Sequence, residues 1–430
     1  MNKATIFWFR RDLRLHDNVG LFHALSKSNN VYPIFIFDKD ITKNLNKDDY
    51  RLSFIIEQIK LMNEKLKKHE CSINIFYGKP LDVFKNIISK TEVEKIVFNK
   101  DYEPYAIKRD DAIKELVTKN NIEFIGYKDH VIFEENEVVK DNGDPYVVYT
   151  PYSRKWINKL NDKEIISYHS DEYLSNLKSF NKTLKIDEVP FSSNLTPLEL
   201  NFNEDVIENY ERDRNFPAIN ATSKLGVHLR FGTKSVRELV LRSNSSENKT
   251  FLKELIWREF FIQILWHFPH TVNKCFKEKY EKVEWINDNE SFIKWCQGNT
   301  GYPIVDAGMR ELNSTGFMHN RVRMITASFL CKHLLIDWRK GEKYFASKLF
   351  DYEQASNVGN WQWVAGCGVD AAPYFRIFNP TEQLKKFDKQ KDYVRKWVPE
   401  FDSESYVDPI IDHKYARERC LNAYKIGLNK

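Results

Sequence analysis

Two kinds of hydrophobic pattern divide the chain. In residues 1–130, short apolar runs alternate with longer stretches in which apolar residues recur every three or four positions. From about Leu198 onward the short runs disappear and helical periodicity dominates. The pattern therefore predicts a region of strands and helices followed by a helical region.

The short runs predict strands whose two faces are both apolar, each followed by a helix. Such strands are typical of a doubly wound parallel sheet with helices on both faces. We expect strands at Thr5–Phe9, Val31–Phe37, Ile73–Tyr77, Lys95–Phe98 and Ile122–Tyr127, and helices at Arg51–Lys68 and Ile107–Lys119. The first strand is followed by WFRRDLRLHDN and not by GxGxxG, so an ordinary NAD site is not predicted.

The length and the change of pattern predict more than one domain, because 430 residues exceed the size at which a single core keeps growing. We expect an α/β domain at 1–130, a polar linker at 131–200 and a larger all-α domain at 201–430. Helical periodicity in the last of these is clearest at Phe251–Trp266, Ile304–Leu312, Arg321–Leu335 and Tyr344–Leu349.

Composition narrows the class of protein. The net charge of +5 permits nucleic-acid binding without requiring it. The six cysteines form no CxxC pair, so we expect reduced thiols and no metal site. Charges interrupt the first apolar run, and no window is long enough to cross a membrane. A cytoplasmic enzyme is the expectation, and the 10 tryptophans are the residues that call for explanation.

The segment FLKELIWREFFIQILW puts Glu254, Trp257 and Arg258 on one helix face. A carboxylate beside an indole on a polar face is unusual for a core helix. From composition alone, a solvated Glu next to a partly buried Trp is the favoured explanation.

A second segment begins a helix with Asn320, Arg321, Arg323 and Met324. Asn320 and Met324 are four residues apart and share a face, with the arginines beside them. Arginines at a helix N-terminus suit a phosphate, because the backbone N–H groups add to the same field.

Two further segments are compatible with a bound cofactor. In FDYEQASNVGNWQWVAGCGVDAAPYFRIFNPTEQ, small residues alternate with Trp361 and Trp363, which permits approach to a flat ring or tight helix packing. Thr222, Ser223 and the backbone of Lys224–Gly226 precede a helix, where hydroxyls and amides can hold a diphosphate or form an N-cap.

Taken together, these segments closely resemble the photolyase/cryptochrome family, with class I cyclobutane pyrimidine dimer photolyases as the nearest branch. The resemblance runs from WFRRDLRLHDN to HKYARERCLNAYK, nearly the whole chain. Its most specific parts are ELIWREF, TGYPIVDAGMRELNSTGFMHNRVRMITASFL, NWQW and DAAPYFRIFNP.

The resemblance implies FAD in the helical domain. Arg323 and Asp351 would pair beside the isoalloxazine ring, and Asn357 would face its N5. An electron-transfer triad would comprise Trp361, Trp338 and Trp285. The remaining cofactor contacts implied are Tyr210, Thr222, Ser223, Lys224, Leu225, Gly226 and Glu353. Two of these depart from the family pattern, because Gly226 replaces a Ser of the phosphate loop and Glu353 replaces an Asp.

Residue identity distinguishes the functions within the family. Asn320 and Met324 match enzymes for the cyclobutane dimer, whereas 6-4 photolyases place two histidines four apart in this segment. Asn357 matches photolyases, whereas many plant cryptochromes have Asp at this position and many insect ones have Cys. Trp257 and Trp363 would flank the lesion and Glu254 would reach its carbonyls, while the implied DNA contacts are Arg214, Arg258, Arg321, Arg376 and Gln383.

The resemblance also implies a carbon–carbon lyase that acts on UV-damaged DNA as a monomer, at the nucleoid in a bacterium. The N-terminal domain would hold an antenna chromophore. Glu103 favours methenyltetrahydrofolate over deazaflavin, FMN or an empty site. The alternatives are a cryptochrome-like photoreceptor, 6-4 repair, and a nucleotide-binding protein without photochemistry.

Overall fold

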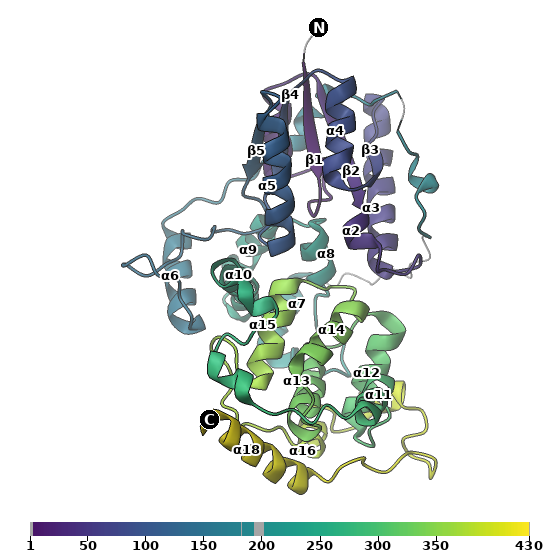
Figure 1. Ribbon diagram of the computed structural model, residues 1–430, viewed down its shortest axis with the longest axis vertical. Coiled ribbons are helices and arrows are strands. Elements are labelled where there is room, and N and C mark those ends of the chain that lie inside the picture. The colour runs from purple at the N-terminus through teal and green to yellow at the C-terminus, as the bar shows by residue number, and fades with distance from the viewer. Residues whose placement is uncertain (1–2, 182, 193–201, 430) are drawn as a thin grey trace. The chain divides into compact units, whose positions relative to one another are not determined.

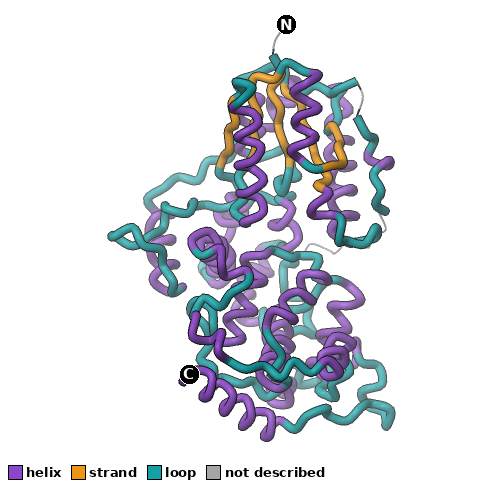
Figure 2. The backbone as a smooth tube through the Cα atoms, viewed as in Figure 1, coloured by secondary structure: helices purple, strands orange, loops and turns teal. Residues whose placement is uncertain are grey.

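The structure is a computed structural model that describes residues 3–181, 183–192 and 202–429. Five strands form one parallel sheet in the order β3-β2-β1-β4-β5, as the apolar runs predict (Figures 1 and 2). The strands are β1 Ala4–Phe9, β2 Val31–Asp38, β3 Asn74–Gly78, β4 Val93–Asn99 and β5 Glu123–Tyr127.

Successive side chains of each strand point to opposite faces of the sheet. Ala4, Ile6 and Trp8 of β1 belong to a buried cluster with apolar residues of α4 and α5, so Thr5 and Phe7 face the other side. Amphipathic helices therefore cover a sheet that is apolar on both faces. The helices of this region are α1 Val19–Leu25, α2 Lys39–Thr42, α3 Tyr50–Leu66, α4 Pro80–Lys90 and α5 Pro104–Thr118.

Contacts group the described chain into two units that interleave along the sequence. The sheet unit comprises 1–137, 156–199 and 225–245, and the helical unit comprises 138–155, 200–224 and 246–430. Two short helices, α8 Gly226–Phe231 and α9 Val236–Ser245, thus belong with the sheet. The consecutive division into 1–130, 131–200 and 201–430 stays a prediction.

The segment expected to be a polar linker contains regular structure. Helix α6 spans Tyr149–Asn161, and the 3-10 turns Ser170–Asn176 and Ile186–Glu188 follow it. Tyr152 and Trp156 of α6 are fully buried, which explains why this part of the segment folds. Part of the expected linker, residues 182 and 193–200, lies outside the described residues.

The helical unit is built around one apolar cluster that includes Trp295, Trp338 and Trp361. The helix expected at Arg321–Leu335 ends at Ser328 and continues as a π-helical turn, Phe329–His333. The helices of the helical unit are α7 Glu204–Asp213, α10 Thr250–His267, α11 Asn289–Gln297, α12 Pro303–Thr315, α13 Asn320–Ser328, α14 Trp338–Lys348, α15 Gln354–Ala365, α16 Pro380–Phe387, α17 Asp392–Trp397 and α18 His413–Asn429.

Within the described residues, none of the helices has the length and apolarity needed to cross a membrane.

Candidate active site

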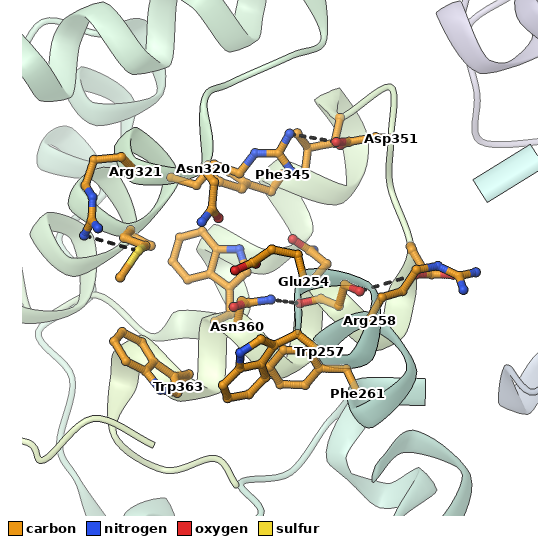
Figure 3. A pocket seen from close by; sticks show the side chains of 18 of the residues that line it. Glu254, Trp257, Arg258, Phe261, Asn320, Arg321, Phe345, Asp351, Asn360 and Trp363 are labelled. Carbon is orange, nitrogen blue, oxygen red and sulfur yellow. Dashed lines mark hydrogen bonds and ion pairs between the residues drawn. The ribbon is translucent and has the colours of Figure 1, made fainter. Parts of the chain in front are cut away.

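A cavity of about 490 Å³ opens in the helical unit, within the size range of small-molecule and cofactor sites (Figure 3). Side chains of α7, α10, α13, α14 and α15 line it, so the site depends on how several helices pack. Of the residues predicted from sequence, the lining includes Tyr210, Arg214, Thr222, Glu254, Trp257, Arg258, Asn320, Arg321, Arg323, Met324, Asp351, Glu353, Asn357, Trp361 and Trp363.

Helix α10 presents Glu254, Trp257 and Arg258 to the cavity, as their spacing predicts, together with Phe261 (Figure 3). The Trp257 ring is stacked on Tyr149, with centroids 3.6 Å apart and planes 5° apart. Tyr149 is held in turn, because its hydroxyl donates to the Lys253 carbonyl at 2.8 Å. The indole is therefore a wall of the cavity with a rigid backing.

Glu254 forms an ion pair with Arg214, which ends α7. Burial raises the pKa of the Glu254 carboxyl, and the Arg214 charge opposes that rise. The site thus holds an acid whose proton is retained to higher pH than that of an exposed Glu.

Arg258 and Glu353 form a second, nearly buried pair, with Nη2 donating to Oε1 at 3.1 Å. Ser356 donates to the other oxygen of Glu353 at 3.3 Å. Glu353, which replaces the Asp of the family pattern, therefore has an ion-pair partner, Arg258, among the residues that line the cavity. The predicted phosphate contact of Arg258 stays a prediction.

Arg323 and Asp351 pair as the resemblance implies, with Nη2 donating to Oδ2 at 2.9 Å. The Nε of Arg323 also donates to the Met318 carbonyl at 2.7 Å, which fixes the guanidinium. The second oxygen of Asp351 is buried and has no hydrogen-bond partner among the described residues. A buried acceptor that faces a cavity is a position for a ligand donor.

Asn357 lies on α15 with its side chain nearly buried. Its Nδ2 donates to the carbonyl of Glu342 at 3.2 Å and to Oε1 of the same residue at 2.9 Å. Burial raises the pKa of the Glu342 carboxyl. The two bonds to Glu342 fix the amide, and in the described structure its Oδ1 remains the atom that can accept from a ligand.

The three tryptophans of the predicted triad differ in burial. Trp361 lines the cavity and is buried, Trp338 is fully buried, and Trp285 is partly exposed. A Cβ on Gly341 would come within 2.2 Å of Cη2 of Trp361, so α14 and α15 approach closely at this glycine. Trp338 lies one helical turn before Gly341 on α14. Trp361 also contacts Trp295 edge-on, with centroids 6.2 Å apart.

Asn320 and Met324 face the cavity from the start of α13. His319, one residue before, is the N-cap of this helix, and its Nδ1 accepts from the Arg321 amide at 3.2 Å. Burial, with Arg323 and Arg321 nearby, lowers the pKa of His319 to about 4. This histidine is thus a neutral structural cap at neutral pH.

Three arginines gather at the edge of the site. The nearby charges of Arg214 and Arg376 add to burial in lowering the pKa of Arg321. Arg321 also donates to Asn215 at 2.5 Å and lies over the Phe387 ring at 4.4 Å, while Arg376 is exposed beside Trp363. Clustered cations that repel one another are suited to polyanionic ligands.

Some predicted residues lie outside the cavity lining. Ser223 is buried, and Lys224 has a left-handed backbone with φ of 56°. Leu225 and Gly226 begin α8 and group with the sheet unit, and Gln383 is partly buried on α16. Glu103, in the sheet unit, accepts from Arg230 at 2.5 Å and lies 3.6 Å from Arg11, so its carboxylate is already paired.

The sequence did not predict several residues that line the cavity, nor Tyr149, which stacks behind Trp257. Phe261 and Asn360 could have been found, because they follow Trp257 and Asn357 by one helical turn. No local pattern pointed to Tyr149, Asn215 or Phe345.

Comparisons with known proteins assign the class that this fold and cavity represent. A family model described as DNA photolyase matches residues 5–172, and one described as the FAD binding domain of DNA photolyase matches residues 251–405. The first covers the sheet, and the second covers most of the residues that line the cavity.

Full-length relatives agree. The deoxyribodipyrimidine photo-lyase of Agrobacterium fabrum is 36% identical over 98% of this chain and 97% of its own length. A bacterial class III photolyase from Agrobacterium tumefaciens has a TM-score of 0.89 at 33% identity, covering 100% of this chain and 98% of that one. This chain therefore belongs to the photolyase/cryptochrome family, and it is an FAD-binding photo-lyase of DNA repair.

Two other solved structures show the breadth of the family. An archaeal photolyase from Sulfolobus tokodaii with two FAD molecules has a TM-score of 0.86 at 33% identity, covering 98% of this chain and 100% of that one. A Synechocystis cryptochrome has a TM-score of 0.84 at 25% identity, covering 98% and 99%. The fold is thus common to repair enzymes and a cryptochrome.

The residues present fit FAD. The unpartnered Asp351 oxygen and the Asn357 Oδ1 offer acceptors to the N–H groups of a reduced flavin, and the fixed Arg323 supplies a positive charge beside them. Tyr210 and Thr222 line the same cavity. The cavity therefore has a donor and acceptors suited to a flavin ring.

Proposed function

We propose that this chain repairs cyclobutane pyrimidine dimers in DNA. The observation that carries the proposal is the convergence on one cavity of two groups of side chains. One group, Glu254, Trp257, Asn320, Met324 and Trp363, suits a flipped-out pyrimidine pair. The other, Arg323, Asp351 and Asn357, suits a flavin, so the two reactants would meet in one cavity.

Binding of the lesion would rely on extrusion from the duplex. A dimer stacks and pairs poorly, so extrusion costs less than for normal bases. Trp257, Trp363 and Met324 offer apolar surfaces to receive it, and the Tyr149 stack holds Trp257 in place without a cost in freedom on binding.

Glu254 would act on the lesion carbonyl. Burial raises the pKa of its carboxyl, which favours the protonated form that could donate to the pyrimidine as negative charge develops there. Arg214, its partner, keeps a positive charge beside the same group.

The protein would hold the cofactor at the right distance and in the right redox state. Reduced FAD, after absorbing light, would supply the electron that opens the cyclobutane ring, and the electron would then return to the flavin. Asn357 would accept from the flavin N5–H through Oδ1, because Glu342 occupies its N–H group. Trp361, Trp338 and Trp285 would pass electrons inward to reduce the cofactor.

The choice of lesion rests on the start of α13. Chemistry on the 6-4 photoproduct would call for a titratable group facing the lesion, and Asn320 and Met324 occupy these positions. The neighbouring His319 is used as a helix cap, and its pKa of about 4 keeps the ring neutral near pH 7, so it does not serve there as an imidazolium acid.

The test is a repair assay in parallel on two substrates. Reduced protein under blue light should restore thymines in an oligonucleotide with a cyclobutane dimer and leave a 6-4 oligonucleotide unchanged. A protein that photoreduces its flavin but repairs neither substrate would support the cryptochrome-like alternative, and 6-4 repair would overturn the lesion assignment.

We also propose a folate antenna, methenyltetrahydrofolate, over deazaflavin or FMN. The pairing of Glu103 with Arg230 and Arg11 means that a folate would have to share this carboxylate. Mass spectrometry of chromophores released from the purified protein decides the matter, and a second flavin in place of a folate would contradict the proposal.

The class within the family and the assembly state are proposals as well. Sequence motifs favour class I, whereas one solved neighbour is named a class III photolyase. We propose a monomer working at chromosomal DNA, in the cytoplasm of a bacterial cell, and light scattering of the protein with and without DNA tests the monomer.

A further inference from the structure

A second group of side chains with the chemistry of a metal site lies in the sheet unit. His16, His169 and Asp171 each offer one ligand atom, and these atoms lie within 4.8 Å of one another. Nδ1 of His16 is 2.8 Å from Oδ1 of Asp171, and the two imidazole rings have centroids 5.4 Å apart. We propose that these three residues form a surface site for a divalent transition ion of the zinc class.

The ligand set selects the kind of ion. Two imidazoles and one carboxylate are borderline ligands that suit Zn²⁺ and its first-row neighbours, whereas Mg²⁺ and Ca²⁺ prefer oxygen alone. In tetrahedral coordination with bonds of about 2.0–2.1 Å, ligand atoms lie about 3.4 Å apart. All three side chains are exposed and can rotate the short remaining distance.

The backbone around the cluster is fixed before any ion binds. The Ser170 hydroxyl donates to the Leu15 carbonyl at 2.6 Å, and the Tyr168 amide donates to Asp17 Oδ1 at 2.8 Å. Asp17 is held further by Arg237. Two segments that are about 150 residues apart in the sequence therefore keep their ligands at short range, which lowers the ordering cost of coordination.

A bound ion would join the segment after β1 to the turn Ser170–Asn176. Because water completes the coordination of three protein ligands, the site remains open to solvent. Its effect is a cross-link that stabilises the sheet unit, and it is separate from the cavity in the helical unit. No photochemistry is needed to observe it.

The experiment is calorimetric titration of the untagged full chain with ZnCl₂, in the dark and without DNA. We expect one Zn²⁺ to bind per chain, and we expect that added MgCl₂ does not displace it. His169→Gln should weaken zinc binding at least about ten-fold, a loss that even removal of an outer-shell partner can bring. The matched control is His270→Gln, another exposed histidine, which should bind as the wild type does.

Thermal unfolding gives a second readout. Zinc should raise the Tm of the wild type and of His270→Gln but leave that of His169→Gln unchanged, because an ion stabilises only a fold that binds it. Absence of stoichiometric binding by the wild type would overturn the proposal, as would equal affinity in His169→Gln. Circular dichroism shows whether each variant is folded.

Discussion

Glu254 is an acid whose environment sets its chemistry. Burial raises its pKa while Arg214 lowers it, so the carboxyl is poised between a hydrogen-bond donor and a paired anion. The protonated form is present below the raised pKa and is lost as pH rises through it. A role as a donor to the lesion therefore predicts a repair yield that falls as pH rises through the pKa of Glu254.

Substitution of Glu254 separates the donor role from a purely structural one. Glu254→Gln keeps a donor at all pH values, so it should retain much of the repair yield and lose the fall with pH. Glu254→Ala should lose several-fold. Yield per absorbed photon across pH, measured on a thymine-dimer oligonucleotide, is the readout, and equal yields in all three proteins would refute the role.

Tyr149 supports Trp257, a wall of the proposed lesion pocket, through a ring stack. An aromatic pair of this kind contributes about 0.5–1.5 kcal/mol beyond burial, which corresponds to roughly a two- to ten-fold change in affinity. Tyr149→Leu should weaken dark binding of a dimer oligonucleotide by that factor. Tyr149→Phe, which keeps the ring but loses the bond to the Lys253 carbonyl, should bind more tightly than Tyr149→Leu, and unchanged binding by Tyr149→Leu would contradict the role.

At the scale of helices, the approach of α14 to α15 positions the inner tryptophans. Gly341 permits it, since an added Cβ would lie 2.2 Å from Trp361 and 2.5 Å from Leu330 Cδ2. Gly341→Ala should force the helices apart at a cost of about 1–3 kcal/mol. We expect a lower urea midpoint and slower photoreduction of the flavin under blue light.

The control for this change is Lys343→Ala, at an exposed position of the same helix. It should leave both the midpoint and the photoreduction rate unchanged. Wild-type rates in a destabilised Gly341→Ala would show that the close approach serves stability alone.

The elements and the site were predictable to different degrees. The five strands, and the face of α10 that carries Glu254, Trp257 and Arg258, were predictable from local periodicity. The pattern of a strand or helix depends only on residues that are close together in the sequence. Tyr149 was not predictable, since it precedes its stacking partner Trp257 by more than 100 residues. The turn at Phe329–His333 was also missed, because a π-helical turn leaves no mark in the hydrophobic pattern.

The cavity itself shows the same limit. Asn320, Met324 and Trp363 came from motifs, but only the packing of α13 against α15 brings them to one space. Periodicity states which face of a helix is apolar and does not state which distant face it meets. Family motifs supplied that information here, and without them Glu254 and Trp257 would have been read as surface residues.

At the scale of the whole molecule, the net charge of +5 gives little long-range attraction to DNA. In the proposed function, affinity would therefore come from local charge, and the group of Arg214, Arg321 and Arg376 at the edge of the cavity would supply it. Arg214 is paired with Glu254 and Arg321 with Asn215, whereas Arg376 is exposed. Arg376 is thus the member best placed to meet a phosphate.

A phosphate contact of Arg376 predicts a defined salt dependence. Each contact to duplex DNA contributes a slope of about −0.9 to a plot of log affinity against log salt concentration. Arg376→Ala should therefore reduce the steepness of that plot by about 0.9 and weaken binding equally for different flanking sequences. The control is Arg417→Ala, on helix α18, which contributes no lining residue. A wild-type slope in Arg376→Ala would exclude the contact, whereas an equal loss in Arg417→Ala would mean that binding depends on overall charge and not on this arginine.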